Sequence, residues 1–105
     1  MTDSEALWKK TLSSLSANGV ELQTLKDGLW FLASARGNRI IIGNAAANAP
    51  SCTLDRLRQV LKTEFIFVHS FYDRWLDGET GISEKIREKS KNSTYILAMI
   101  KHFSD

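Results

Sequence analysis

The sequence predicts an α+β fold in one domain, and three observations support this. Two apolar runs flank a short Arg-Gly-Asn-Arg turn at residues 36–39, which is typical of a β-hairpin. On both sides of this region, apolar residues recur at helical spacing instead. The chain has 105 residues, 43% of them hydrophobic, which is enough for one domain with its own core. We therefore expect one domain over residues 1–105: an N-terminal helix, a three-stranded antiparallel meander, and three or four C-terminal helices packed on the sheet.

A single apolar stripe predicts the first helix, over residues 3–17. The stripe consists of Leu7, Trp8, Leu12 and Leu15. Thr2 and Glu5 have the spacing of a capping box at the start of this helix. Gly19 predicts its end, because glycine readily adopts the left-handed conformation that terminates helices.

The predicted meander has strands at residues 20–25, 29–35 and 39–44, with a tight Asp-Gly turn at residues 27–28. In the second strand, Phe31 and Ala33 share one face, whereas Trp30 and Leu32 share the other. Both faces are therefore apolar, unlike a sheet with one face in water. We expect something to cover the second face.

Helices are predicted for most of the remaining chain, after a loop at residues 44–51. The first runs from a Thr53 cap to about residue 62 and buries Leu54, Leu57 and Leu61. Residues 63–77 fit helical spacing better than a strand at 65–68, so we interpret them as a helix. A shorter helix, starting at Thr80 or Ser83, extends to about residue 89. Asn92 or Ser93 is expected to cap the last one.

Composition indicates a soluble protein of a reducing compartment. Cys52 is the only cysteine, so an intrachain disulfide is impossible. No apolar run reaches the length of a membrane span, and the polar N-terminus does not resemble a signal peptide. We therefore expect a cytoplasmic protein with no membrane partner. The net charge of +2 permits an anionic partner without demanding one.

Residues that could carry catalysis or bind metal are few. His69, Asp73 and Asp77 are spaced i, i+4 and i+8, too far apart along a helix for one ion, so we interpret them as a surface His–Asp pairing. Cys52 lacks a sequence-local base, and we interpret it as a packing residue. The chain contains no nucleophile elbow, phosphate loop or dinucleotide motif. We expect no enzyme, cofactor or metal; a small-molecule or enzymatic cleft near Cys52 and His69 is an alternative.

The segment 85–93 is the best candidate for contact with an anion or a nucleic acid. It holds four basic residues against one acidic residue and leads into a helix N-terminus. Cations, hydroxyls and unpaired backbone N–H groups together suit phosphate. A second basic cluster lies near residue 57. The candidate contact residues are Arg56, Arg58, Arg87, Lys89, Lys91 and Ser93.

Surplus apolar surface predicts that the chain associates with a second copy of itself. The sheet has a second apolar face, and the aromatic run near residue 70 is wider than one buried stripe. The expected homodimer interface consists of Trp30, Leu32, Ile41, Phe67 and Phe71. Our preferred interpretation is a small non-enzymatic binding module that is homodimeric; nucleic-acid association through residues 85–93 is the first alternative.

The order of motifs also resembles a group of small proteins. An N-terminal helix precedes a hairpin through Gly-Leu-Trp-Phe at residues 28–31, then a Thr-Leu helix start at 53–54, an aromatic-rich helix, and Asn-Ser-Thr-Tyr-Ile at 92–96. This pattern resembles small uncharacterised proteins of mobile gene cassettes or of regions beside restriction systems. The resemblance spans most of the chain and implies a defence-linked or DNA-associated accessory role, with no assigned activity or functional residue.

Overall fold

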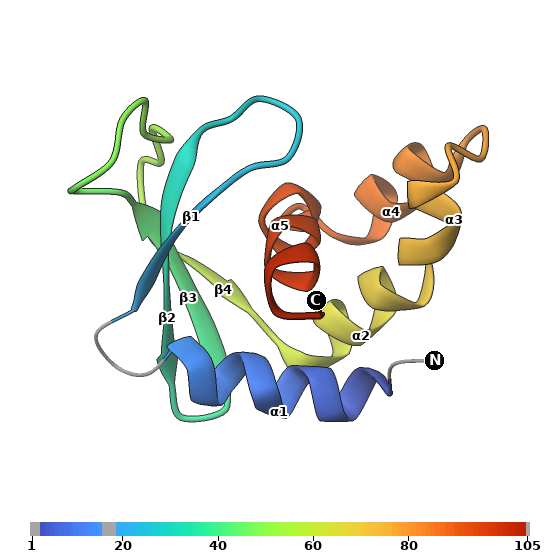
Figure 1. Cartoon of the computed structure of the whole chain (residues 1–105), viewed down its shortest axis with the longest axis horizontal. Coiled ribbons are helices and arrows are strands. Elements are labelled where there is room, and N and C mark those ends of the chain that lie inside the picture. The colour runs from blue at the N-terminus through green and yellow to red at the C-terminus, as the bar shows by residue number, and fades with distance from the viewer. Residues whose placement is uncertain (1–2, 16–18, 105) are drawn as a thin grey trace.

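The structure is a four-stranded antiparallel sheet with all its helices on one side (Figure 1). The computed structural model describes residues 3–15 and 19–104. The strands lie side by side in chain order: β1 (Val20–Gln23), β2 (Trp30–Arg36), β3 (Arg39–Asn44) and β4 (Arg58–Val60). The helices are α1 (Ser4–Leu15), α2 (Lys62–Ser70), α3 (Tyr72–Leu76), α4 (Ile82–Lys89) and α5 (Ser93–Ser104). The predicted α+β class is confirmed, with four strands instead of three.

The core lies between the sheet and the helices α1, α2 and α5. Strand alternation places Phe31, Ala33, Ile40 and Ile42 on this side, where all four are fully buried. The ring centroids of Trp8 and Phe65 are 5.2 Å apart, which joins α1 to α2. The predicted stripe of the first helix is correct for Leu7, Trp8 and Leu15. Its predicted capping residue Thr2 and its last two predicted residues, 16–17, lie outside the described residues.

The opposite side of the sheet, which we call the open face, is apolar as expected. It carries Trp30, Leu32 and Ile41, which are half-buried and lie outside the core cluster. Leu57 lies over Gly43, where an added Cβ would come within 2.8 Å of the leucine Cδ2. No helix among the described residues covers this face (Figure 1).

A loop after β3 covers one side of the open face and is anchored by Glu21 of β1. The Glu21 carboxylate accepts hydrogen bonds from the backbone N–H groups of Ala46, Ala47 and Asn48, at 2.9 to 3.0 Å. These donors stabilise the charged form of the carboxyl group and lower the pKa of Glu21 to about 2. Glu21 is therefore charged at neutral pH, the form in which its oxygens accept these hydrogen bonds.

The helix predicted from Thr53 to about residue 62 is wrong. This segment is extended and ends in β4, where Val60 pairs with Ile40 of β3 and is fully buried. Leu57 and Leu61, expected inside, are 64% and 48% exposed. The side chain of Asn44 pairs with both backbone groups of Leu54, at 2.7 and 3.1 Å, as a neighbouring strand would. Sheet pairing therefore prevails over the helical spacing of the leucines.

The aromatic segment is helical, as predicted, but it forms two helices rather than one. The break falls at Phe71, whose N–H bonds the Val68 carbonyl while the Ser70 hydroxyl bonds the Phe67 carbonyl. Phe67 and Phe71 pack on each other, with centroids 5.2 Å apart, and against the core. Part of their apolar surface therefore lies against the chain's own core, and their place in a homodimer interface stays a prediction.

The two competing structures for residues 53–62 make opposite predictions for alanine substitutions. We expect Val60→Ala to lower the free energy of unfolding by about 2 kcal/mol, because Val60 is fully buried against β3. Leu61→Ala should change it by less than about 0.5 kcal/mol. Urea denaturation followed by circular dichroism measures both values. A larger loss for Leu61→Ala than for Val60→Ala would contradict the strand.

Candidate functional site

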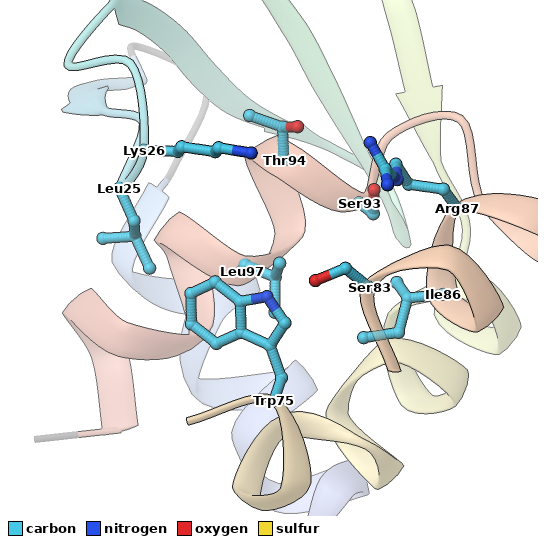
Figure 2. Close-up of a pocket in the computed structure, with 9 residues that line it drawn as sticks. All are labelled: Leu25, Lys26, Trp75, Ser83, Ile86, Arg87, Ser93, Thr94 and Leu97. Carbon is cyan, nitrogen blue, oxygen red and sulfur yellow. The ribbon is translucent and has the colours of Figure 1, made fainter. Parts of the chain in front are cut away.

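A pocket opens between the β1–β2 loop, α3, α4 and the N-terminus of α5 (Figure 2). We call it the α5 pocket. Its volume is about 100 Å³. One side is polar and the other is apolar. The lining residues are Leu25, Lys26, Trp75, Ser83, Ile86, Arg87, Ser93, Thr94 and Leu97.

The polar side of the α5 pocket offers only hydrogen-bond donors and hydroxyls. Lys26 and Arg87 contribute two positive charges, and Figure 2 shows their nitrogens on the same side as Thr94 and Ser93. Neither cation has a salt bridge or hydrogen bond with another described residue. No carboxylate lines the pocket. The site is therefore suited to an anion.

The hydroxyl of Ser93 is the most informative group in the pocket. Ser93 is only 5% exposed as a residue, and no hydrogen bond joins its Oγ to another of the described residues. Every fully buried side-chain polar atom among the described residues has a partner, so the Ser93 Oγ is an atom that solvent still reaches. Since Ser93 lines the α5 pocket, its hydroxyl can bind a group that enters this pocket.

The N-terminus of α5 is also left without a side-chain cap. Asn92 precedes the helix, and its carbonyl accepts the N–H groups of Tyr95 and Ile96 at 3.0 Å. Its side chain was expected to cap the helix but donates elsewhere, to the Gln59 carbonyl and to Glu64. The N–H groups of Ser93 and Thr94 make no hydrogen bond outside the helix with any described residue. They carry the positive end of the helix dipole.

Glu64 holds the turn before α5 in place. Its carboxylate, in the first turn of α2, accepts the Ser90 hydroxyl at 2.7 Å and the Asn92 Nδ2 at 3.2 Å. Ser90 and Asn92 are both buried. The chain between α4 and α5 is thereby fixed against α2, which sets the position of Ser93 relative to Arg87.

The β1–β2 loop brings Leu25 and Lys26 to the pocket. This loop has six residues, longer than the predicted two-residue turn, because Thr24 closes it. The buried Thr24 side chain accepts the Leu29 N–H at 2.9 Å, and its own N–H bonds the Leu29 carbonyl. Gln23 adds a hydrogen bond to the Gly28 carbonyl, where the backbone has a positive φ of 68°.

The apolar side of the pocket consists of Leu25, Trp75, Ile86 and Leu97. Trp75 is held by the neighbouring ring of Tyr72, which stacks on it with centroids 6.1 Å apart. Ser83, Ile86 and Arg87 follow one another at i, i+3 and i+4 on α4, so one helix face supplies three lining residues.

A second cavity, of about 430 Å³, lies further along α5. Leu25 lines both cavities, and the second one adds Trp30, Lys101 and His102. Its only carboxylate, Glu21, is already bonded to the loop after β3. We consider the α5 pocket the better candidate, because its donors have no partner.

The structure divides the predicted anion-contact residues between two surfaces. Arg87 and Ser93 lie together in the α5 pocket. Arg56, Arg58 and Lys91 line a separate hollow, in which the Arg58 Nη1 donates to the Lys91 carbonyl at 3.3 Å. Lys89 is exposed and lines neither.

Cys52 and His69 have different hydrogen-bond partners, Tyr95 and Ser4. Burial raises the pKa of the Cys52 thiol, which has a side-chain hydrogen bond with Tyr95. Burial lowers the pKa of His69, whose Nδ1 is 2.6 Å from the Ser4 Oγ. No group of three His, Cys, Asp or Glu side chains that could hold a metal occurs in the part of the chain that the structure describes. Likewise, none of the described helices could cross a membrane.

Comparison with known proteins gives no match: no family model, no curated protein and no solved structure is significantly similar to this chain. The resemblance to mobile-cassette proteins therefore stays a prediction. The site must be interpreted from its own geometry.

Sequence reasoning missed Leu25, Lys26, Trp75 and Ser83 as site residues. The helical spacing of Ser83, Ile86 and Arg87 could have indicated Ser83, because it joins a hydroxyl to a cation already singled out. Lys26 and Trp75 reach the pocket only through tertiary packing. No local pattern marks them.

The Glu64 contacts predict how the turn before α5 responds to substitution. We expect Glu64→Ala to lower the free energy of unfolding by about 1–3 kcal/mol, because it leaves the buried Ser90 hydroxyl without its acceptor and removes one of the two acceptor residues of the Asn92 side chain. Glu64→Gln keeps an acceptor oxygen and should lose less than half as much. Glu84→Ala, at an exposed α4 position, is the control. If thermal denaturation shows that Glu64→Ala is as stable as Glu84→Ala, this role of Glu64 is contradicted.

Proposed function

We propose that the protein is a small binding module that recognises an oxyanion in the α5 pocket. The convergence of Lys26, Arg87 and the Ser93 hydroxyl on one pocket, with no hydrogen bond or salt bridge to another described residue, carries this proposal. The two N–H groups of the first turn, together with Lys26 and Arg87, supply the charge and the donors that an oxyanion requires.

The composition of the pocket supports binding rather than catalysis. Its lining contains no His, Cys, Asp or Glu, the side chains that most often transfer protons or attack substrates. Lys26 and the hydroxyls lie near no base within the lining. We therefore keep the proposal of a non-enzymatic protein. The lone, buried thiol of Cys52 suits the cytoplasmic location that we also propose.

Calorimetric titration with inorganic phosphate tests the proposed function. We expect Arg87→Gln to weaken binding about tenfold, because it removes a charge-assisted hydrogen bond. Ser93→Ala should weaken it roughly fivefold through loss of one neutral donor. Lys89→Gln is a matched control, since it removes one positive charge from the same helix outside the pocket. It should keep the wild-type affinity within about twofold.

Two results would contradict the oxyanion site. Absence of phosphate binding by the wild type at low salt is one. Equal weakening by Lys89→Gln and Arg87→Gln is the other, because it would indicate attraction to net charge rather than to a built site.

Self-association is a second proposal, favoured by the open face. Trp30, Leu32 and Ile41 lie outside the chain's own core cluster, with the exposed Leu57 beside them. Contiguous apolar surface of this kind is typical of an interface. We therefore propose a homodimer through the open face, and a contribution of Phe67 and Phe71 to it stays a prediction. The split basic clusters give nucleic-acid association less support, and it stays a prediction.

Light scattering at tens of micromolar tests the homodimer. We expect about twice the chain mass of 11.8 kDa for the wild type. Ile41→Lys should yield the monomer, because it places a charge within the open face. Leu76→Lys, at a 54% exposed position on α3, should stay dimeric. A monomeric wild type would rule out the homodimer at this concentration.

A further inference from the structure

The α5 pocket has one polar and one apolar side, and this restricts the chemistry of the ligand beyond its oxyanion. The donors of Lys26, Arg87 and Ser93 lie opposite the apolar surfaces of Trp75 and Leu97 (Figure 2). A bare inorganic ion would meet the donors and leave the apolar side in contact with water. A complementary ligand carries an apolar group directly beside its charged one.

The number and origin of the donors favour phosphate over carboxylate. Two cations, two backbone N–H groups and the Ser93 hydroxyl approach from three elements, the β1–β2 loop, α4 and α5. A phosphate presents three acceptor oxygens and a charge between about −1.5 and −2 at neutral pH. A carboxylate is planar, with two oxygens and a single charge, and would leave part of this donor set without a partner.

The shape of the apolar side favours a planar ring. Trp75 lines the pocket while Tyr72 stacks on it at an interplanar angle of 23°, so that its indole is held as a fixed platform. Leu25, Ile86 and Leu97 surround this platform. The volume of about 100 Å³ is smaller than the roughly 150 Å³ cavity that encloses benzene. One small ring, partly inserted, therefore fits, and a larger ligand must extend outside.

We propose that the ligand of the α5 pocket is a phosphomonoester carried on a small planar ring, with the phosphate at the N-terminus of α5 and the ring on Trp75. This inference rests on the proposed function and adds the chemical class of the ligand. The Trp75 contact supplies the preference for the ring, and the donors of Lys26, Arg87 and Ser93 supply the preference for phosphate.

The test is calorimetric titration of the intact protein with inorganic phosphate, methyl phosphate, cyclohexyl phosphate, phenyl phosphate and benzoate. We expect phenyl phosphate to bind about tenfold more tightly than methyl phosphate, with cyclohexyl phosphate between them. Benzoate should bind more weakly than phenyl phosphate. Trp75→Leu should bring phenyl phosphate within about threefold of methyl phosphate and leave inorganic phosphate unchanged. Trp30→Leu is the matched control and should keep the full preference, because Trp30 lines the second cavity and not the α5 pocket.

The outcomes separate this inference from the proposed function. If inorganic phosphate binds but phenyl and methyl phosphate bind equally, the ring is wrong and the oxyanion site stands. Equal binding of cyclohexyl and phenyl phosphate overturns the planar ring, and tighter binding of benzoate overturns the phosphate. If none of the probes binds, both proposals fail. Should Trp75→Leu fail to fold, Trp75→Phe keeps a ring and should keep the preference for phenyl phosphate while losing the ligand-induced change in tryptophan fluorescence; loss of that preference contradicts the proposal.

Discussion

The carboxylate of Glu64 accepts a hydrogen bond from the Ser90 hydroxyl and another from the Asn92 side chain, and this contact joins the turn before α5 to α2. Asn92 is the natural capping residue for α5, but its side-chain amide is drawn toward α2. The helix therefore begins with its first N–H groups without side-chain partners. The same contact sets the path of the chain from α4 to α5, and so brings the Arg87 side chain and Ser93 to one pocket.

The lack of a side-chain cap does not itself distinguish α5, because α2, α3 and α4 also begin without one. The surroundings of its N-terminus do. Around the α5 pocket, the Ser93 hydroxyl and two cations have no partner in the described chain, and all three line one cavity. Polar groups that converge on a cavity in this way are suited to a ligand that completes their interactions.

The sequence predicts most of the fold because most of its elements are locally encoded. The alternation of Ile40 to Ile42 places β3 at residues 39–44, as observed, and the stripe through Trp8 locates α1. The failure at residues 53–62 has a definite cause: Leu54, Leu57 and Leu61 have helical spacing, whereas Val60 and the Asn44 side chain select an extended chain through contacts distant in sequence.

The candidate site, too, can be predicted from the sequence only in part. Arg87 and Ser93 could be predicted, since a basic segment that leads into a helix N-terminus is itself a local pattern. Lys26 and Trp75 could not, because they come from a hairpin loop and a short helix that meet only in the folded chain. Ser90 and Glu64 lie 26 residues apart in the sequence, and no periodic pattern predicts the contact between them.

The assembly of the α5 pocket from the β1–β2 loop, α3, α4 and α5 has a thermodynamic consequence. A ligand bound as we propose would contact several of these segments at once, and the unfolded chain does not hold them together. Its occupancy would therefore add to the stability of the native state, by about 2.7 kcal/mol at a ligand concentration one hundred times the Kd. For a small domain that amount is a substantial share of the whole free energy of unfolding. The abundance of the folded protein in a cell would then follow the concentration of its ligand.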